Sequence, residues 1–111
     1  MAELPRIHDG TFADEVFRAS QPTLVEFWAE WCQPCQAADK VLQEVAAAYG
    51  PGLRVVQLDV DESPVAALLY GVHTVPTLIL FRLEEEKLRV TGTFSKESLL
   101  RKIRDALQTP R

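Results

Sequence analysis

The chain lacks several features that would assign it at once to a large class of proteins. Its 111 residues contain no long uninterrupted apolar run, so we expect neither a membrane-spanning helix nor a secretory leader. A net charge of -4 and the absence of a basic cluster argue against nucleic acid or an anionic membrane as the main partner. No glycine-rich motif of the kind that cradles phosphates is present, so we expect no nucleotide cofactor on this chain.

Cysteine is also scarce, because Cys32 and Cys35 are the only two. Without a leader we expect a cytoplasmic location, where such a pair serves redox or metal chemistry more often than it serves as a structural staple. Zinc prefers four ligands, and beyond the sulfurs the chain offers only His8 and His73, at no recognised metal spacing. The pair therefore favours disulfide chemistry over half a zinc site or two inert core thiols.

What the chain does contain is ordinary for a globular protein, with 47% hydrophobic and 25% charged residues, and we expect one domain over residues 1–111. Apolar patterns and turn residues predict a β-α-β-α-β-α-β-β-α order, which is an α/β fold with helices on both sides of a sheet. The expected strands cover residues 7–8, 23–29, 53–59, 77–82 and 88–91. The expected helices cover residues 11–19, 32–49, 64–70 and 96–107.

Capping residues and apolar stripes add detail to these helices. Thr11 is expected to cap the first helix with Asp14 closing a capping box, and Ser63 and Ser95 are expected to cap the third and fourth helices. Two stripes are expected to face the core: Ala38, Val41, Leu42, Val45 and Tyr49 in the second helix, and Val65, Leu68 and Leu69 in the third.

The two cysteines lie where the apolar strand of residues 23–29 gives way to the long helix. Cys32 would stand at the helix start, where free N–H groups and the helix dipole favour a thiolate over a thiol. Pro34 suits the first turn, since its missing N–H has no partner there anyway. Cys35 lies one turn deeper and close enough to form a disulfide with Cys32. We therefore expect an exposed, reactive Cys32 and a sheltered Cys35.

Over nearly its whole length the chain resembles the thioredoxin family. The matching pieces are FWAEWCxPC at residues 27–35, Val75-Pro76-Thr77 after a short helix, and Gly92 before the last helix. The resemblance implies a thioredoxin fold, with a mixed sheet of about five strands flanked by about four helices. It also implies a protein-disulfide reductase, with Cys32 as nucleophile and Cys35 as resolving cysteine. Electrons would come from NADPH through a flavin-dependent thioredoxin reductase, and we expect a monomer.

Glu26 stands alone among Leu24, Val25, Phe27 and Trp28, so a carboxyl group is placed in a strand that otherwise has the pattern of protein interior. Burial would raise its pKa. The position matches the buried aspartate of thioredoxins, and the resemblance implies a proton shuttle for Cys35. The alternative is a residue at a strand edge whose carboxylate reaches water.

The resemblance also implies a cis Val75–Pro76 peptide bond and a surface on which protein substrates dock. That surface would include Trp31, Gln33, Pro34, Val60, Thr74, Val75 and Gly92. Glycine at position 92 would permit close approach of a partner's backbone, and Val75 would be open to pairing with an extended substrate segment.

The chain departs from the family pattern at four places. Gln33 replaces a glycine between the cysteines, which leaves the redox potential open. Gln57 replaces a lysine near the buried acid and so removes a positive charge there. Lys40 stands where a kinking proline is common, and the turn at residues 84–87 lacks a glycine and is expected to be longer.

Two alternatives to a reductase stay open at this point. One is a disulfide oxidase or isomerase, which the altered dipeptide between the cysteines would suit if it destabilises the disulfide. The other is a protein-binding module with incidental redox activity. A lone acid in an apolar strand argues against the second, because a binding surface needs no buried carboxyl group.

Overall fold

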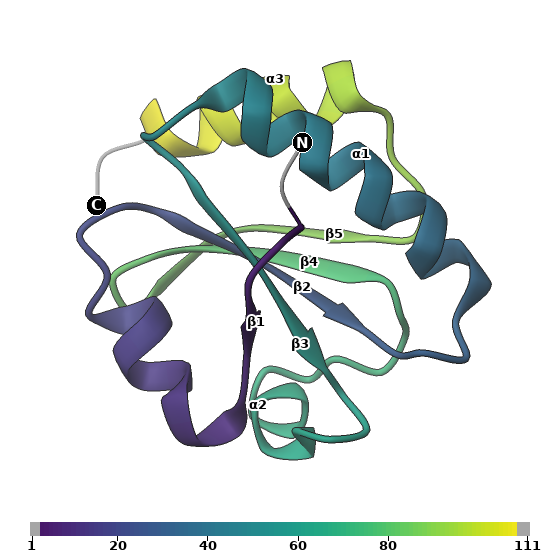
Figure 1. Cartoon of the computed structure of the whole chain (residues 1–111). Coiled ribbons are helices and arrows are strands. Elements are labelled where there is room, and N and C mark those ends of the chain that lie inside the picture. The colour runs from purple at the N-terminus through teal and green to yellow at the C-terminus, as the bar shows by residue number, and fades with distance from the viewer. Residues whose placement is uncertain (1–2, 109–111) are drawn as a thin grey trace.

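The computed structural model describes residues 3–108, in which five strands form one mixed sheet in the order β1-β3-β2-β4-β5. Strands β1, β2 and β3 are parallel, β4 runs antiparallel to β2, and β5 runs antiparallel to β4. This sheet confirms the predicted thioredoxin fold (Figure 1). The strands are β1 (Arg6–Ile7), β2 (Thr23–Trp28), β3 (Arg54–Asp59), β4 (Thr77–Arg82) and β5 (Glu85–Thr91), and the α-helices are α1 (Gln33–Tyr49), α2 (Pro64–Leu69) and α3 (Lys96–Gln108).

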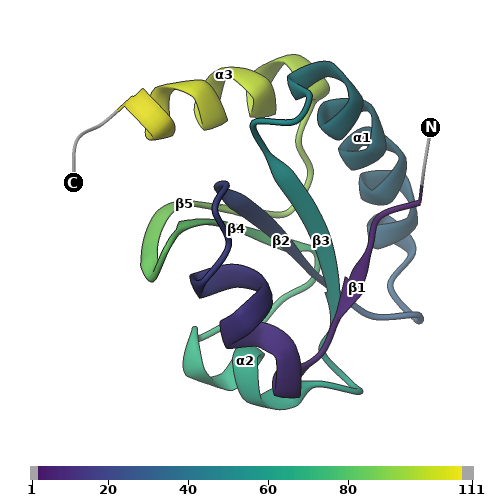
Figure 2. The ribbon, with the colours of Figure 1, turned by 60° about the vertical axis from the view of Figure 1, so that its left-hand side comes forward.

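Helices cover both faces of the sheet, as Figures 1 and 2 show. Helices α1 and α3 lie on one face, over a core that includes Leu24, Leu42 and Leu99. Helix α2 and the helical turns of residues 9–17 lie on the other, over a second core that includes Phe12, Phe27 and Phe81. No helix among the described residues is both long and apolar enough to cross a membrane.

Strand β2 lies in the middle of the sheet, paired with β3 on one side and β4 on the other. Its residues 23–27 are buried, because both faces of the strand are covered by helices. That position explains the continuous apolar pattern in its sequence, since a strand buried on both faces cannot alternate between apolar and polar residues. It also places Glu26 inside the protein.

Helix α1 begins and ends, and helix α3 begins, as the sequence predicts. Cys32 is the N-cap of α1 and Pro34 lies in its first turn, while the helix stops at Gly50, whose φ of 86° suits glycine. The hydroxyl group of Ser95 accepts a hydrogen bond from the N–H of Ser98 at 3.1 Å, which confirms the predicted cap of α3. Helix α1 continues through Lys40 without a break.

The first predicted helix is wrong in form, although two of its apolar side chains are buried. Instead of one helix from residue 11 to residue 19, the chain makes a 3-10 turn at Asp9–Thr11 and a π-helical turn at Ala13–Phe17. The hydroxyl group of Thr11 accepts from the N–H of His8, so it turns back along the chain and does not cap a helix after it. Phe12 and Val16 are nonetheless buried.

Helix α2 presents a different face to the core from the one predicted. The buried residues are Ala66 and Ala67, whereas Val65, Leu68 and Leu69 are exposed. The cap is also different: Ser63 makes no side-chain bond to the helix, and its hydroxyl accepts from the N–H of Asp9 instead. The Asp9 carboxylate then accepts from the N–H groups of Val65 and Ala66, at 2.9 and 2.8 Å. This six-residue helix is thus capped by a distant segment and turns its two alanines inward.

The hairpin between β4 and β5 has a shorter turn than predicted. Arg82 pairs with Glu85, which leaves Leu83 and Glu84 as the turn. Leu83 takes the left-handed conformation that glycine normally supplies, with a φ of 56°. Strand β5 therefore starts at Glu85, three residues before the predicted residue 88. Leu80 pairs with Leu88 and Phe81 with Glu86, so the pairing of β4 with β5 shifts by one residue between Leu80 and Phe81.

Candidate active site

The two cysteines form a disulfide at the junction of β2 and α1. Their Cα atoms are 5.3 Å apart, and the second cysteine is the third residue after the first. Cys32 has an extended backbone as the N-cap of α1, and its sulfur accepts a hydrogen bond from the N–H of Cys35 at 3.2 Å. A sulfur that accepts from a helix N-terminus is in the environment that stabilises a thiolate once the disulfide is reduced.

The prediction of an exposed Cys32 is wrong for the disulfide form. Cys32 is 3% exposed and Cys35 is 2% exposed. Both pack with Ala29, and the partly buried Trp28, Val60 and Val75 lie against them. The cover arises because the turn after β2 folds the cysteines against the loops that follow β3 and precede β4.

Glu26 is fully buried in the centre of the sheet, so the alternative of a solvated strand-edge residue is wrong. One carboxyl oxygen, Oε1, accepts from Nε2 of Gln57 at 2.9 Å, and the other, Oε2, is buried without a hydrogen-bond partner. Burial raises the pKa of Glu26 from its ordinary value of 4.5 to about 7, with a smaller upward contribution from the Asp39 charge; the Gln57 bond acts in the opposite direction. Glu26 can therefore hold or release a proton near neutral pH.

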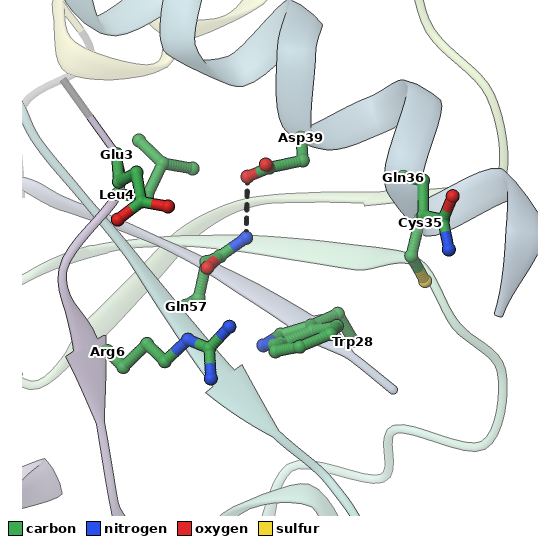
Figure 3. Close-up of a pocket in the computed structure, with 8 residues that line it drawn as sticks. All are labelled: Glu3, Leu4, Arg6, Trp28, Cys35, Gln36, Asp39 and Gln57. Carbon is green, nitrogen blue, oxygen red and sulfur yellow. Dashed lines mark hydrogen bonds between the residues drawn. The ribbon is translucent and has the colours of Figure 1, made fainter. Parts of the chain in front are cut away.

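Asp39 is a site residue that the sequence reasoning missed. Its Oδ1 accepts from the same Nε2 atom of Gln57 at 2.6 Å, so one amide nitrogen bonds both Asp39 and Glu26. The signal was available, because Asp39 follows Cys35 by four positions in α1 and so projects from the same side of the helix. The Asp39–Gln57 bond that joins α1 to β3 is drawn in Figure 3.

Asp39 and Gln57 border a pocket of about 190 Å³ beside the disulfide. Its walls come from the segment before β1, from β1 to β3 and from α1, and Figure 3 shows Arg6 and Trp28 on the opposite side of Gln57 from Asp39. The guanidinium group of Arg6 lies 5.0 Å from the centre of the Trp28 ring. The residues that line the pocket are Glu3, Leu4, Arg6, Trp28, Cys35, Gln36, Asp39 and Gln57.

Four of the residues expected to dock substrates lie together in a second depression, of about 340 Å³. They are Trp31, Val60, Thr74 and Val75, and Val72 and His73 complete the lining. Trp31 is 70% exposed, and its indole N–H donates to Oδ2 of Asp61 at 2.9 Å, which fixes the ring at the rim. The Val75–Pro76 peptide bond is cis, as the resemblance implied.

The other three expected docking residues lie outside this depression. Gln33 and Pro34 are exposed at the start of α1, and Pro34 and Pro76 border a separate hollow together with Thr93 and Phe94. The N–H of Gly92 donates to the carbonyl oxygen of Pro76 at 3.1 Å. Among residues 3–108, and apart from the two chain neighbours of Gly92, no atom lies within 4 Å of the place of a Cβ at this position, so its φ of 81°, not crowding, is the structural reason for glycine.

No group of three or more His, Cys, Asp or Glu side chains in residues 3–108 could hold a metal ion. His8 is exposed beside β1, and His73 lies in the depression with Trp31.

Comparison with known proteins agrees with this geometry. The family model described as Thioredoxin matches residues 3–105. The thioredoxin of Mycolicibacterium smegmatis is 41% identical over 103 residues, which cover 91% of this chain and 92% of the relative. The thioredoxin of Mycobacterium bovis is 39% identical over 102 residues (92% and 88%), and thioredoxin 1 of Synechococcus elongatus is 37% identical over 99 residues (89% and 92%). The chain therefore belongs to the thioredoxin family and is a thiol–disulfide oxidoreductase that acts as a protein-disulfide reductase.

Proposed function

We propose that the chain reduces disulfides of other proteins through Cys32 as nucleophile and Cys35 as resolving cysteine. In the dithiol form, the Cys32 thiolate attacks one sulfur of the substrate disulfide, and the other substrate sulfur leaves as a thiolate that takes up a proton. Cys35 then loses its proton and attacks the Cys32 sulfur. The second substrate thiol is released, and two electrons have passed from the Cys32–Cys35 pair to the substrate.

The observation that carries this assignment is the position of Cys32 as the N-cap of α1, with its sulfur accepting from the Cys35 N–H. A thiolate at that atom is stabilised by the helix N-terminus, whereas Cys35 lies inside the first turn and lacks this advantage. The two sulfurs are close enough to form the Cys32–Cys35 disulfide, so Cys35 can reach the mixed disulfide.

Glu26 is the proposed acid and base for Cys35. A pKa of about 7 allows the carboxylate to accept the proton of Cys35 during resolution and to return it when the pair is reduced again. Since Oε1 is already bonded to Gln57, the unpartnered Oε2 is the proposed proton-carrying atom. Cys35 lines the same pocket as Gln57 and Asp39, so polar groups lie on this side of the disulfide.

An extended segment of the substrate is the proposed occupant of the depression formed by Trp31, Val60, Thr74 and Val75. Apolar groups predominate there, and the exposed Trp31 ring offers a large contact area. Val75 precedes Thr77, the first paired residue of β4, so its backbone lies beyond the sheet pairing and suits strand addition by a substrate. Gln33, Pro34 and Gly92 would contact flanking parts of the substrate.

Reduction of the protein itself is proposed to take place in the cytoplasm. A flavin-dependent thioredoxin reductase would pass two electrons from NADPH to the Cys32–Cys35 disulfide, and this chain would bind neither cofactor. This partner is supported by family membership alone.

A turnover assay tests the proposal. Insulin is mixed with NADPH, a thioredoxin reductase and the wild-type protein, and NADPH oxidation is followed. We expect continuous turnover for the wild type, none for Cys32→Ser, and a stable mixed disulfide between Cys35→Ser and the substrate. Glu26→Gln is expected to lower the rate and to remove the titration near pH 7 from its pH profile. Binding of insulin without NADPH consumption would instead support a binding module, and an unchanged Glu26→Gln profile would remove the role of Glu26.

A further inference from the structure

Two acids share a single amide group beside the disulfide, and only one of them has a proposed role. Gln57 donates one hydrogen of its amide nitrogen to Glu26 in β2 and the other to Asp39 in α1, at 2.9 and 2.6 Å. Glu26 is fully buried, whereas Asp39 is half-buried and lines the pocket. Gln57 thus connects an inner acid to an outer one.

We propose that Asp39 is a positioning residue for Glu26. Asp39 orients Gln57 toward the buried acid and, by its charge, holds the proton on that acid. The proposal rests on the proposed role of Glu26 and names the group that sets when the acid can act. No atom of Asp39 needs to contact the substrate for this effect.

The orienting part follows from hydrogen-bond chemistry. A primary amide has a donor end and an acceptor end, and a carboxylate can only accept, so the bond to Asp39 requires the nitrogen of Gln57 to face α1. Asp39 is itself held by Gln43, whose Nε2 donates to Oδ2 at 3.2 Å. The second hydrogen of Gln57 then points to Oε1 of Glu26, which leaves Oε2 as the oxygen free to carry the proton.

The charge part follows from proximity. Because the oxygens of both acids bond the same nitrogen atom, they lie within about 5.5 Å of each other, where two like charges oppose ionisation of the more buried one. The Asp39 charge therefore acts in the same direction as burial and raises the pKa of Glu26. The other charged groups that line this pocket are Glu3, from the segment before β1, and Arg6, from β1. Trp28 of β2, which also lines it, and Leu78 of β4, which pairs with Glu26, are uncharged.

The consequence is a control on when Cys35 can be deprotonated. While Asp39 is ionised, Glu26 keeps its proton to a higher pH and becomes a stronger base once the proton is lost. Without Asp39, Glu26 would ionise at lower pH and would be a weaker base for Cys35.

The test follows the titration of Glu26 itself in the disulfide form, in which the cysteines carry no proton. Protein labelled with ¹³C at glutamate side-chain carboxyls is titrated by NMR, and Glu26→Gln identifies the Glu26 resonance by its loss. We expect Asp39→Asn, which still offers Gln57 an acceptor oxygen, to lower the Glu26 midpoint by roughly half to one pH unit. Asp39→Ala, which suits a helix, removes both the charge and the acceptor that orients Gln57. Because the Gln57 bond lowers the pKa of Glu26, the midpoint of this variant should fall less than that of Asp39→Asn.

Glu44→Gln is the matched control, because Glu44 is an exposed acid of the same helix and its loss changes the net charge equally. Its Glu26 midpoint should equal that of the wild type. The proposal is overturned if both Asp39 variants also titrate like the wild type. If they shift the midpoint while Glu26→Gln leaves the reductase rate and its pH profile unchanged, Asp39 acts as proposed and the role of Glu26 in turnover is what fails.

Discussion

Burial of Glu26 should make the stability of the folded protein depend on pH in a way that a single substitution removes. The unfolded chain loses the Glu26 proton near pH 4.5, whereas the folded protein keeps it until about pH 7. The folded state therefore binds more protons across this window, and its free energy of unfolding falls as the pH rises through it. Below pH 4.5 the effect is absent, and above pH 7 it is complete.

The size of the effect follows from the pKa shift. Each unit corresponds to about 1.4 kcal/mol, so the shift from 4.5 to about 7 costs the wild type about 3 kcal/mol above pH 7. Glu26→Gln carries no charge at any of these pH values, and its amide oxygen can still accept from Gln57. The variant should gain about 3 kcal/mol relative to the wild type between pH 4.5 and pH 8.

Urea unfolding of the disulfide form, followed by circular dichroism, measures the difference. With a slope of about 1.5 kcal/mol per molar urea, the gain corresponds to a relative shift in the unfolding midpoint of about 2 M. Glu44→Gln, the same change at an exposed position of α1, should show a pH dependence close to that of the wild type. A stability difference between Glu26→Gln and the wild type that stays constant from pH 4.5 to pH 8 would refute the reasoning.

Two further predictions concern packing and capping. Leu42→Ala, on the buried face of α1, should lower the free energy of unfolding by about 2 to 5 kcal/mol. Leu68→Ala, at a position of α2 that is 78% exposed, should change it by no more than about 0.5 kcal/mol. Urea titrations of both variants compare the losses, and equal losses would mean that the face of α2 is misassigned. Asp9→Ala removes the acceptor for the N–H groups of Val65 and Ala66 and should lower the free energy of unfolding by about 1 to 2 kcal/mol. Relative to the wild type, hydrogen exchange should become faster in α2 more than in α1. Unchanged exchange at these two amides would count against the long-range cap.

Those elements that the sequence predicted correctly are the ones whose pattern is local. The stripe from Ala38 to Tyr49 in α1 depends on spacings of three and four residues, and the run of residues 23–29 depends on burial of both strand faces. The cap at Ser95 is a contact across three residues. Such patterns carry their own evidence, because the interacting residues are neighbours in the chain.

Two of the wrong predictions, the face of α2 and the exposure of Cys32, involve residues that are distant in the sequence. Helix α2 turns Ala66 and Ala67 inward and is capped by Asp9, which lies far away in the sequence, so its orientation depends on tertiary contacts. The cover over Cys32 comes from Val60 and Val75, on loops that only the folded sheet brings to the cysteines. A short helix with apolar residues all round offers no local signal for choosing between its faces.

The sequence by itself determined the fold class, the disulfide pair at the strand-to-helix junction and the presence of an acid in the central strand, since each follows from the order and spacing of residues along the chain. Only the tertiary structure decided what that acid meets. The register of β2 on β3 sets Glu26 beside Gln57, and the packing of α1 brings Asp39 to the same amide. The proton affinity of Glu26 therefore depends on three segments at once, because burial and charge act through space and not along the chain.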